Sequence, residues 1–256
     1  MADRIREGED AVEVPAKIPI GERDRVFVLT GAGISAESGL ATFRASDGLW
    51  SGHRVEDVAS PEGWDADPGL VWRFYSQRRR DAAAAHPNPA HLLLAELESR
   101  LGKRFFLCTQ NVDDLHERAG SRNLVHMHGQ LFLSRCEDDC GRPVFVDREA
   151  HEAEIPLCAC GARIRPHIVW FGEIPMEMDR IGMELDRSTL LLVVGTSGAV
   201  HPAASFVQWA DQRNRSGETH VRTIYVGPEP PLNARAFTSI VLGKAGQVLP
   251  GLFETT

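Results

Sequence analysis

The chain has 256 residues, a formal net charge of −8, and 43% hydrophobic and 25% charged residues, which is the composition of a soluble globular protein. No apolar run approaches the ~20 residues that span a bilayer, and the first residues, MADRIREGEDAVEVPAK, lack the apolar core of a signal peptide. The acidic balance disfavours nucleic acid as a partner, because such binding relies on basic surface. We therefore expect a cytoplasmic protein with a flexible tail at residues 1–20 and no membrane partner.

Short apolar runs rich in β-branched residues recur at residues 26–30, 105–108, 190–194 and 223–226. Each is bounded by turn residues, as is typical of parallel strands buried on both faces. Helical patterns lie between them, for example at residues 89–100, where Leu93, Leu94 and Leu97 follow helical spacing. This alternation predicts an α/β fold with a doubly wound, Rossmann-like parallel sheet.

Two stretches interrupt the alternation. Residues 41–86 contain three tryptophans and are predicted to form loop and helices, whereas residues 131–166 contain four of the five cysteines and little helical pattern. We expect two insertions, at about 42–86 and 131–167, to form a smaller helical and zinc-binding domain. The Rossmann part would then comprise about 21–41, 87–130 and 168–256.

The first predicted strand runs into Gly31-Ala32-Gly33-Ile34-Ser35-Ala36, a G-x-G-x-x-A pattern followed by a predicted helix. Such glycines let the backbone approach a pyrophosphate, and the amides that open the helix favour negative charge. The alternative is a tight turn without a ligand. An ordinary dehydrogenase is not predicted, because no acidic residue ends a second strand ~20 residues later.

Tyr75 and Arg78 lie one turn apart on a predicted helix. A phenol and a guanidinium at this spacing could clamp a carboxylate. The alternative is that the pair, together with the basic run Arg78-Arg79-Arg80, belongs to a solvated helix face.

Ligand-type residues follow the second predicted strand. Gln110, Asn111 and Asp113 could bond ribose hydroxyls or a carboxamide at the carboxyl end of the sheet, or cap the next helix. His128 in His126-Met127-His128-Gly129 is a candidate general base, since the unperturbed histidine pKa is about 6.5. A histidine taken alone is more often structural, and we keep that interpretation for His126.

Four cysteines form two close pairs, Cys136-x3-Cys140 and Cys158-x-Cys160. Four thiolates suit a closed, structural tetrahedral zinc site. The alternatives are unligated thiols or a site that recruits Asp139 or His151. Cys108, within a predicted strand, is expected to be a small buried apolar residue.

Gly195-Thr196-Ser197-Gly198 follows the third predicted strand. This small-residue turn could bind phosphate through backbone and hydroxyl groups, or it could be a simple loop.

Together these residues resemble the sirtuins, the NAD-dependent protein-lysine deacylases. The resemblance runs from about Arg25 to Leu252 and rests on GAGISAESGLATFR, TQNVDDLHERAG, HMHG, RPHIVWFGE, GTSGAVHPA and the four cysteines. Residues 43–64, FRASDGLWSGHRVEDVASPEGW, and the Tyr75/Arg78 pair resemble the bacterial, desuccinylase-type class III branch.

The resemblance implies roles for the residues around NAD, which would be a consumed co-substrate. His128 would be the catalytic base. The cofactor-binding residues would be Gly31, Ala32 and Gly33 at the phosphates, Phe43 and Arg44 on a loop near the nicotinamide ribose, Gln110, Asn111 and Asp113 at the ribose and carboxamide, Gly195, Thr196 and Ser197 at the adenosine, and Ala245 near the adenine.

The resemblance also implies a peptide site, in which an acyl-lysine substrate adds as a strand between two walls. One wall would include Val169, Phe171, Gly172 and Glu173, and the other Gly198 and Val200. Tyr75 and Arg78 would contact the acyl group. Apart from the peptide site, the resemblance implies structural zinc bound by Cys136, Cys140, Cys158 and Cys160.

The implied reaction removes acetyl and succinyl groups from lysine and releases nicotinamide and O-acyl-ADP-ribose, and a monomer is expected. An NAD hydrolase or mono-ADP-ribosyltransferase on the same fold is one alternative. A zinc-stapled module that senses NAD without catalysis is another.

Overall fold

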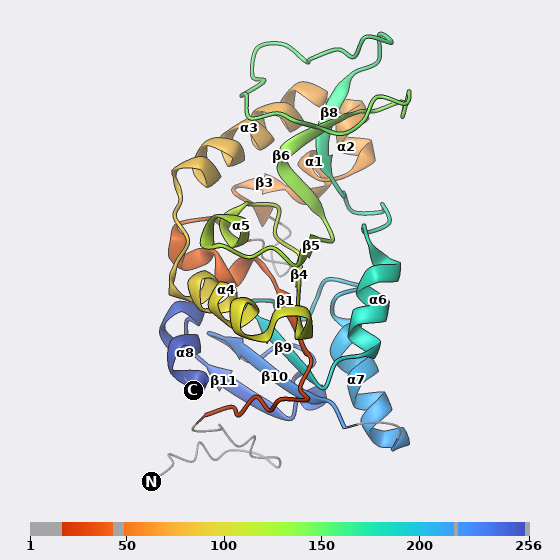
Figure 1. The fold of residues 1–256 in the computed structure, drawn as a ribbon. Helices are drawn as coiled ribbons and strands as arrows, with labels where there is room; N and C mark the ends of the chain where they lie inside the picture. The colour runs from red at the N-terminus through yellow and green to blue at the C-terminus, as the bar shows by residue number, and fades with distance from the viewer. Residues whose placement is uncertain (1–16, 43–48, 218–219, 254–256) are drawn as a thin grey trace.

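The computed structural model describes residues 17–42, 49–217 and 220–253 (Figure 1). Its centre is a sheet of six parallel strands in the order β11-β10-β9-β1-β4-β5. Because all six strands run the same way, their carboxyl ends meet at one edge of the sheet. The strands are β1 Val26–Thr30, β4 Phe105–Thr109, β5 Leu124–His126, β9 Leu190–Val194, β10 Arg222–Gly227 and β11 Ser239–Leu242.

Helices cover both faces of this sheet, which confirms the doubly wound architecture. One face packs against α4 Pro89–Leu101 and α8 Ala245–Leu252, and the other against α6 Met178–Asp186 and α7 Ser205–Ser216 (Figure 1). Side chains alternate across each strand, so Val28 lies in the first core and Phe27 and Leu29 lie in the second.

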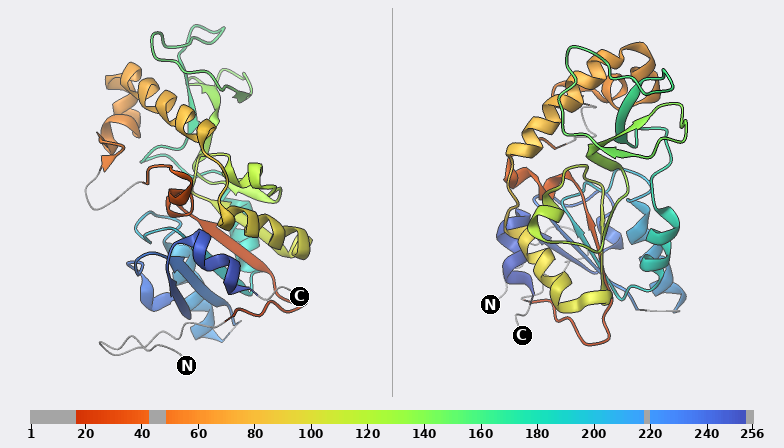
Figure 2. Two further views of the ribbon diagram at one scale, coloured as in Figure 1. Left: turned by 90° about the vertical axis from the view of Figure 1, so that its left-hand side faces the viewer. Right: turned by 45° about the horizontal axis from the view of Figure 1, so that its top comes forward.

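A second layer, here called the upper module, lies beyond the carboxyl edge of the sheet (Figures 1 and 2). Its core holds Trp64, Trp72 and Trp170. An antiparallel sheet in the order β7-β6-β8 packs against its helices. The module comprises α1 Val55–Val58, α2 Pro61–Ala66, α3 Pro68–Ala84, β6 Gly129–Cys136, β7 Phe145–Val146 and β8 Ile164–Ile168.

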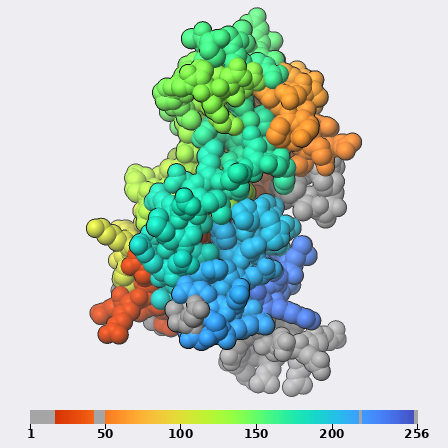
Figure 3. Space-filling view, turned by 90° about the vertical axis from the view of Figure 1, so that its right-hand side faces the viewer, coloured from red at the N-terminus to blue at the C-terminus, as the bar shows by residue number. Residues whose placement is uncertain are grey.

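The short elements complete the fold. The strands β2 Leu49–Trp50 and β3 His53–Arg54 pair next to α1, and α5 Leu115–Ala119 follows β4. Single 3₁₀ turns are η3 Gly102–Arg104 and η4 Ala234–Ala236. In the space-filling view, the turquoise segment that carries residues 168–190 runs between the upper module and the sheet layer (Figure 3).

The chain after β1 differs from the predicted helix. It forms two 3₁₀ turns, η1 Ala32–Ile34 and η2 Ala36–Ser38, and ends at Gly39 with φ +88°. One reason is that the Ile34 carbonyl accepts a hydrogen bond from Asn88 Nδ2 at 2.7 Å. That carbonyl is therefore already engaged by a side chain instead of by the N–H four residues later that an α-helix would use.

The interpretation of Arg78-Arg79-Arg80 as a solvated face is wrong for two of the three residues. Arg79 is 2% exposed, and Arg78 is half-buried. Only Arg80 points outward, where it pairs with Glu152. Among the helices of the described residues, none has the length and apolar character that a membrane crossing needs.

Candidate active site and zinc site

Two glycine turns meet backbone to backbone at the carboxyl edge of the sheet. Gly31 N–H donates to the Val194 carbonyl at 3.0 Å, and Gly33 N–H donates to the Gly195 carbonyl at 2.8 Å. A Cβ on Gly33 would lie 2.7 Å from Gly195 Cα, closer than non-bonded carbon atoms approach. Gly195 has φ +65°, a conformation that favours glycine. The glycines therefore bring the turns after β1 and β9 together, with Ala32 half-buried between them.

A buried polar cluster lies behind the first turn. Ser35 Oγ donates to Asp113 Oδ2 at 3.1 Å and accepts from Asn111 Nδ2 at 3.2 Å. Asp113 Oδ1 also accepts from Leu115 N–H at the start of α5, at 3.2 Å. Asp113 therefore belongs to the cluster and also caps a helix. Burial raises the pKa of Asp113.

Sequence reasoning did not single out Ser35, although it lies inside the quoted glycine motif. Its contact with His91 Nε2, at 3.5 Å, joins the turn to α4. The available signal was a hydroxyl residue two positions after the second glycine. That signal is weak, because serine commonly occurs in turns.

Gln110 presents an unused donor to the edge of the sheet. Its N–H donates to the Thr30 carbonyl at 2.9 Å, which fixes the backbone. Its side-chain Nε2 is buried and has no hydrogen-bond partner among the described residues. An orphaned buried amide needs an explanation, and together with the glycine turns it fits a site that holds a polar ligand such as a dinucleotide.

His128 lies in the turn between β5 and β6. Its Nδ1 is 3.1 Å from the Gln110 carbonyl oxygen. A carbonyl only accepts, so Nδ1 carries the proton. Burial lowers the pKa of His128, with partial opposition from this hydrogen bond. The ring is therefore neutral near pH 7, and Nε2 has no hydrogen-bond partner among the described residues, so its lone pair can serve a general base.

His126, two residues earlier, is held by the protein on both sides. Its Nε2 lies 2.7 Å from Glu117 Oε1, and its Nδ1 lies 2.8 Å from the Asn111 carbonyl oxygen. Burial alone would lower the pKa of His126, but the hydrogen bond and charge of Glu117 outweigh it and raise that pKa. These contacts agree with the structural interpretation of His126.

Tyr75 and Arg78 point into the interior of the upper module. The Tyr75 hydroxyl accepts from Trp170 Nε1 at 3.1 Å, and burial raises the pKa of Tyr75 to about 12. Arg78 Cζ lies 4.1 Å above the Trp50 ring. Arg78 Nε is buried and has no hydrogen-bond partner among the described residues. The alternative of an exposed surface pair is therefore wrong, and the guanidinium is available to an anion.

The segment after β8 forms a wall next to His128. Val169 N–H donates to the His128 carbonyl at 2.9 Å. Phe171 is 46% exposed, and Gly172 adopts φ +91°. The Glu173 carboxylate accepts from Arg165 Nη1 at 2.7 Å and from Trp170 N–H at 2.8 Å. Glu173 is thus engaged within the protein and shapes the wall.

The turn after β9 contains a second glycine besides Gly195. Gly198 has φ +72°, and a Cβ there would lie 2.5 Å from Asn233 Oδ1. Thr196 and Val200 are half-buried, and Ser197 is exposed.

Ala245 is buried at the first residue of α8, beside the sheet edge. The next residue, Gly246, donates its N–H to Glu37 Oε2 at 2.6 Å, which links α8 to η2. Phe43 and Arg44 lie outside the described residues.

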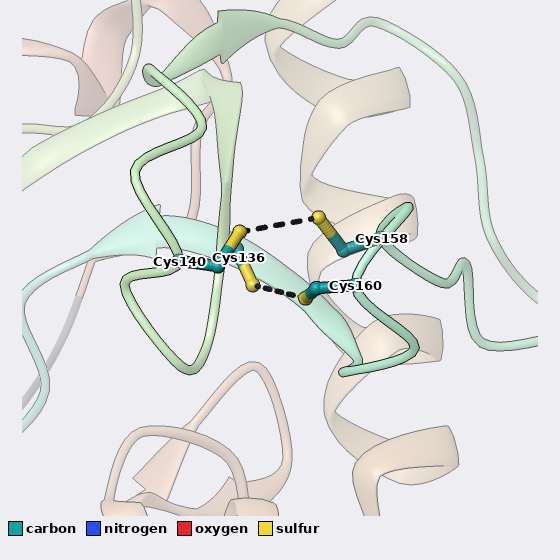
Figure 4. A group of neighbouring side chains, drawn as sticks. All are labelled: Cys136, Cys140, Cys158 and Cys160. Carbon is teal, nitrogen blue, oxygen red and sulfur yellow. Dashed lines mark hydrogen bonds between the residues drawn. The ribbon is translucent and has the colours of Figure 1, made fainter.

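The four cysteines converge from the ends of β6 and β8 (Figure 4). Their sulfur atoms all lie within 4.8 Å of one another, with 3.6 Å between Cys136 and Cys160 and between Cys140 and Cys158. Tetrahedral zinc with bonds of about 2.3 Å separates its sulfurs by about 3.8 Å, whereas a disulfide would need about 2.05 Å. The set therefore fits a closed structural zinc site.

The alternative ligands of that site are engaged elsewhere. Asp139 pairs with Arg135 at 3.6 Å, and His151 Nε2 pairs with Asp147 at 3.0 Å. Among the described residues, the group whose ligand atoms are close enough to share a metal ion consists of the four cysteines. Cys108 is fully buried in β4, as expected.

A doubly wound sheet with paired glycine turns, an unsatisfied amide and a neutral histidine at its carboxyl edge defines a dinucleotide-binding α/β protein with a zinc module. The chain belongs to the Sir2 family, whose model matches residues 31–202.

Two relatives carry the name NAD-dependent protein deacylase. The protein of Escherichia coli strain K12 is 48% identical over 235 residues, which cover 91% of this chain and 82% of that protein. The protein of Vibrio cholerae serotype O1 is 46% identical over 231 residues, which cover 90% and 92%.

Two solved structures have the same architecture. A Sir2 homologue in complex with NAD superposes with a TM-score of 0.79 at 42% identity, over 89% of this chain and 88% of that one. A Sir2 protein bound to a myristoylated histone peptide superposes with a TM-score of 0.67 at 31% identity, over 88% of each chain.

Proposed function

We propose that this chain is an NAD-dependent protein-lysine deacylase that removes acetyl groups and also succinyl or other dicarboxyl groups. The observation that carries the proposal is His128, a neutral histidine with a free Nε2 between the Gln110 loop and the wall of residues 169–173. The membership of the Sir2 family and the names of its relatives support the same activity.

NAD would be held along the carboxyl edge of the sheet. When bound, it supplies an electrophilic ribose carbon and nicotinamide as a leaving group. The turn of Gly31, Ala32 and Gly33 would face the phosphates with its backbone amides. Asn111 and Asp113 would fix the nicotinamide end, because Ser35 already holds both side chains in one orientation. Gln110 Nε2 would find its missing partner there.

Three further assignments complete the proposed cofactor site. Thr196 and Ser197 would face the adenosine ribose, beside Gly195. Ala245, at the start of α8, would lie near the adenine. Phe43 and Arg44 would lie on the loop near the reacting ribose.

His128 would take a proton at Nε2 from a ribose hydroxyl once nicotinamide has left. The Gln110 carbonyl holds the ring in the tautomer that this step needs. As nicotinamide leaves, the acyl oxygen of the substrate would bond to the ribose carbon. Once His128 has taken the proton, the hydroxyl oxygen would attack the acyl carbon, and addition of one water would release lysine and leave the acyl group on ADP-ribose. The upper module would exclude water that competes for the reacting carbon.

The peptide would lie between the wall of Val169, Phe171, Gly172 and Glu173 and the segment of Gly198 and Val200. Main-chain hydrogen bonds would bind many sequences with little discrimination. Arg78 would bond the distal carboxylate of a succinyl group, since its Nε has no partner among the described residues. We propose that a monomer acts on acyl-lysine in proteins or peptides, without nucleic acid or membrane.

The decisive experiment offers acetyl-lysine and succinyl-lysine peptides with NAD and follows products by mass spectrometry. We expect nicotinamide and O-acyl-ADP-ribose in wild type, and a loss of about 10²- to 10⁴-fold in His128→Ala, as for removal of a general base. His220→Ala, at an exposed histidine, is the control.

Each alternative has its own outcome. Nicotinamide release without peptide would favour an NAD hydrolase or ADP-ribosyltransferase. Undetectable turnover, or turnover unchanged in His128→Ala, would leave a module that binds NAD without catalysis. Elemental analysis should find one zinc per chain, and its absence would refute the four-cysteine site.

A further inference from the structure

Tyr225 reaches the carboxyl edge of the sheet from within β10. Its ring lies in the core beneath α6 and α7 and contacts Phe237, with 5.5 Å between the ring centroids. The ring extends along the strand, because residues two apart share a face. A Cβ on Gly227 would lie 2.6 Å from Tyr225 Cζ, and the hydroxyl is the nearest atom to that position. The missing side chain of Gly227 is what leaves room for the phenol.

The end of β10 lies between the two segments proposed for the adenosine. On one side, Gly195 N–H donates to the Val226 carbonyl at 2.9 Å. On the other side, Gly243 N–H donates to the Gly227 carbonyl at 2.9 Å, two residues before Ala245. The end of β10, toward which the Tyr225 hydroxyl extends on the α6 and α7 side of the sheet, therefore lies between the turn of Gly195 and the loop that leads into α8.

The chemistry of this hydroxyl suits a neutral polar partner. It makes no hydrogen bond within the part of the chain that the structure describes, and its oxygen is not fully buried. Burial, with the nearby charge of Glu229, raises the pKa of Tyr225 to about 12. The phenol thus stays protonated near pH 7 and can both donate and accept. A sugar hydroxyl matches it better than a phosphate, because the Glu229 charge lies close by.

We propose that Tyr225 is a cofactor-specificity residue whose hydroxyl hydrogen-bonds a hydroxyl of the adenosine ribose of NAD. This inference rests on the proposed NAD-dependent function. It adds a contact from the interior of the sheet to those from the glycine turns.

The test compares wild type with Tyr225→Phe. We expect the KM for NAD to rise about 3- to 10-fold, as for loss of one neutral hydrogen bond. The value of kcat, the KM for the acyl peptide and Tm should not change. The sharper arm uses NAD analogues that lack the 2′ or the 3′ hydroxyl of the adenosine ribose. Wild type should bind one of the two analogues about 3- to 10-fold more weakly than it binds NAD. Tyr225→Phe should bind that analogue and NAD with equal affinity.

Gly227→Ala provides a second variant that keeps the phenol. The added Cβ must displace the Tyr225 ring, so the KM for NAD should rise while the analogue penalty disappears. If each analogue loses as much affinity for Tyr225→Phe as for wild type, relative to NAD, the proposal is overturned. So would an unchanged KM for NAD.

Calorimetric titration with ADP-ribose separates the failure of this inference from the failure of the proposed function. It needs no turnover. If ADP-ribose binds wild type more tightly than Tyr225→Phe and the protein does not deacylate, the proposed function is refuted but the Tyr225 contact is supported. If ADP-ribose binds both proteins equally and wild type does deacylate, only the Tyr225 contact is refuted.

Discussion

Arg78 is a half-buried cation with few partners among the described residues. Its Nε has no hydrogen bond among the described residues, and its guanidinium stacks on Trp50 at 4.1 Å. Burial lowers its pKa, against the nearby hydroxyl of Tyr75 and the charge of Asp113. A side chain held in this way costs stability, which is typical of residues kept for function.

Replacing Arg78 by Met should therefore separate stability from activity. We expect Tm to change little, because an apolar side chain of similar length replaces a half-buried guanidinium whose Nε has no partner among the described residues. The kcat/KM for succinyl-lysine peptides should fall about 10- to 100-fold, as for loss of a charged hydrogen bond, with a change of only a few-fold for acetyl-lysine. Arg73→Met, at an exposed residue of α3 paired with Asp67, is the control. Equal losses for the two acyl groups would exclude the carboxylate contact.

The pH dependence of kcat/KM should report His128. A general base works in its neutral form, and burial lowers the pKa of His128 below the ordinary 6.5. Activity should therefore persist as the pH falls through 6.5 and decline only below it. Steady-state rates between pH 5 and 8 would check this. An acidic limb centred at or above pH 6.5 would contradict the assignment of His128 as a buried, neutral base.

At the scale of elements, Arg79 joins α3 to the three-stranded sheet. Its Nε donates to the Leu131 carbonyl at 2.9 Å, and its Nη1 lies 3.1 Å from Asp147 Oδ2. The side chains of Arg79 and Asp147 are only 2% and 8% exposed. The helix that carries Tyr75 and Arg78 is thus fixed to β6, which follows His128 directly.

We expect Arg79→Met to lower the free energy of unfolding by about 3–5 kcal/mol, because it removes the buried guanidinium that pairs with Asp147 and leaves that carboxylate only Ser134 and His151. Arg80→Met, at the exposed neighbour, should change it by less than about 1 kcal/mol. Urea unfolding followed by circular dichroism would measure both. Similar effects of the two substitutions would show that the Arg79 contacts are not a principal link between helix and sheet.

The sequence predicts the central strands well and the ends of the sheet poorly. Residues 26–30 and 190–194 match β1 and β9, because a strand buried on both faces is apolar throughout. The edge strands β5 and β11 have three and four residues, too few for an apolar run to stand out. The sequence after Gly33 predicts a helix and not the observed 3₁₀ turns, because the hydrogen bond from Asn88 to Ile34 joins segments far apart in sequence.

The candidate site was predictable as a set of residues but not as a set of contacts. Gln110, Asn111 and Asp113 are predicted because they follow a predicted strand, whereas His128 is predicted from the ordinary histidine pKa and from the family resemblance. The sequence does not predict which of Arg78, Arg79 and Arg80 are buried. Consecutive helical residues point about 100° apart, and only the packing of the upper module decides which of them face its interior. The position of Tyr225 depends on Gly227 and on two neighbouring strands, which no local pattern reveals.

At the scale of the whole molecule, buried histidines should make stability depend on pH. Burial lowers the pKa of His91 to about 4 and lowers those of His116, His128 and His167. Each is protonated in the unfolded chain below about pH 6.5 but stays neutral in the folded protein, so folding loses stability as the pH falls. His126, with a raised pKa, acts in the opposite sense but is a single group.

Unfolding free energies measured between pH 7 and 4.5 should therefore fall on acidification. Each buried neutral histidine contributes up to about 1.4 kcal/mol per pH unit in this window. His91→Gln should flatten the slope relative to wild type, and His220→Ala should not. A stability that is constant or rises between pH 6.5 and 4.5 would contradict the neutral state of these rings.

The place of β1 in the sheet has a consequence for how the protein is made. Its neighbours are β4 on one side and β9 on the other, and Arg25 bonds to Thr189, 164 residues later in the chain. Contacts over such separations form slowly, because a long loop must close first. The amides of Gly31 and Gly33 find their acceptors on Val194 and Gly195, so a ribosome must release about three quarters of the chain before the first glycine turn has its supporting strand. Until then a nascent chain could not gain stability from NAD, however much of the dinucleotide the cell contains.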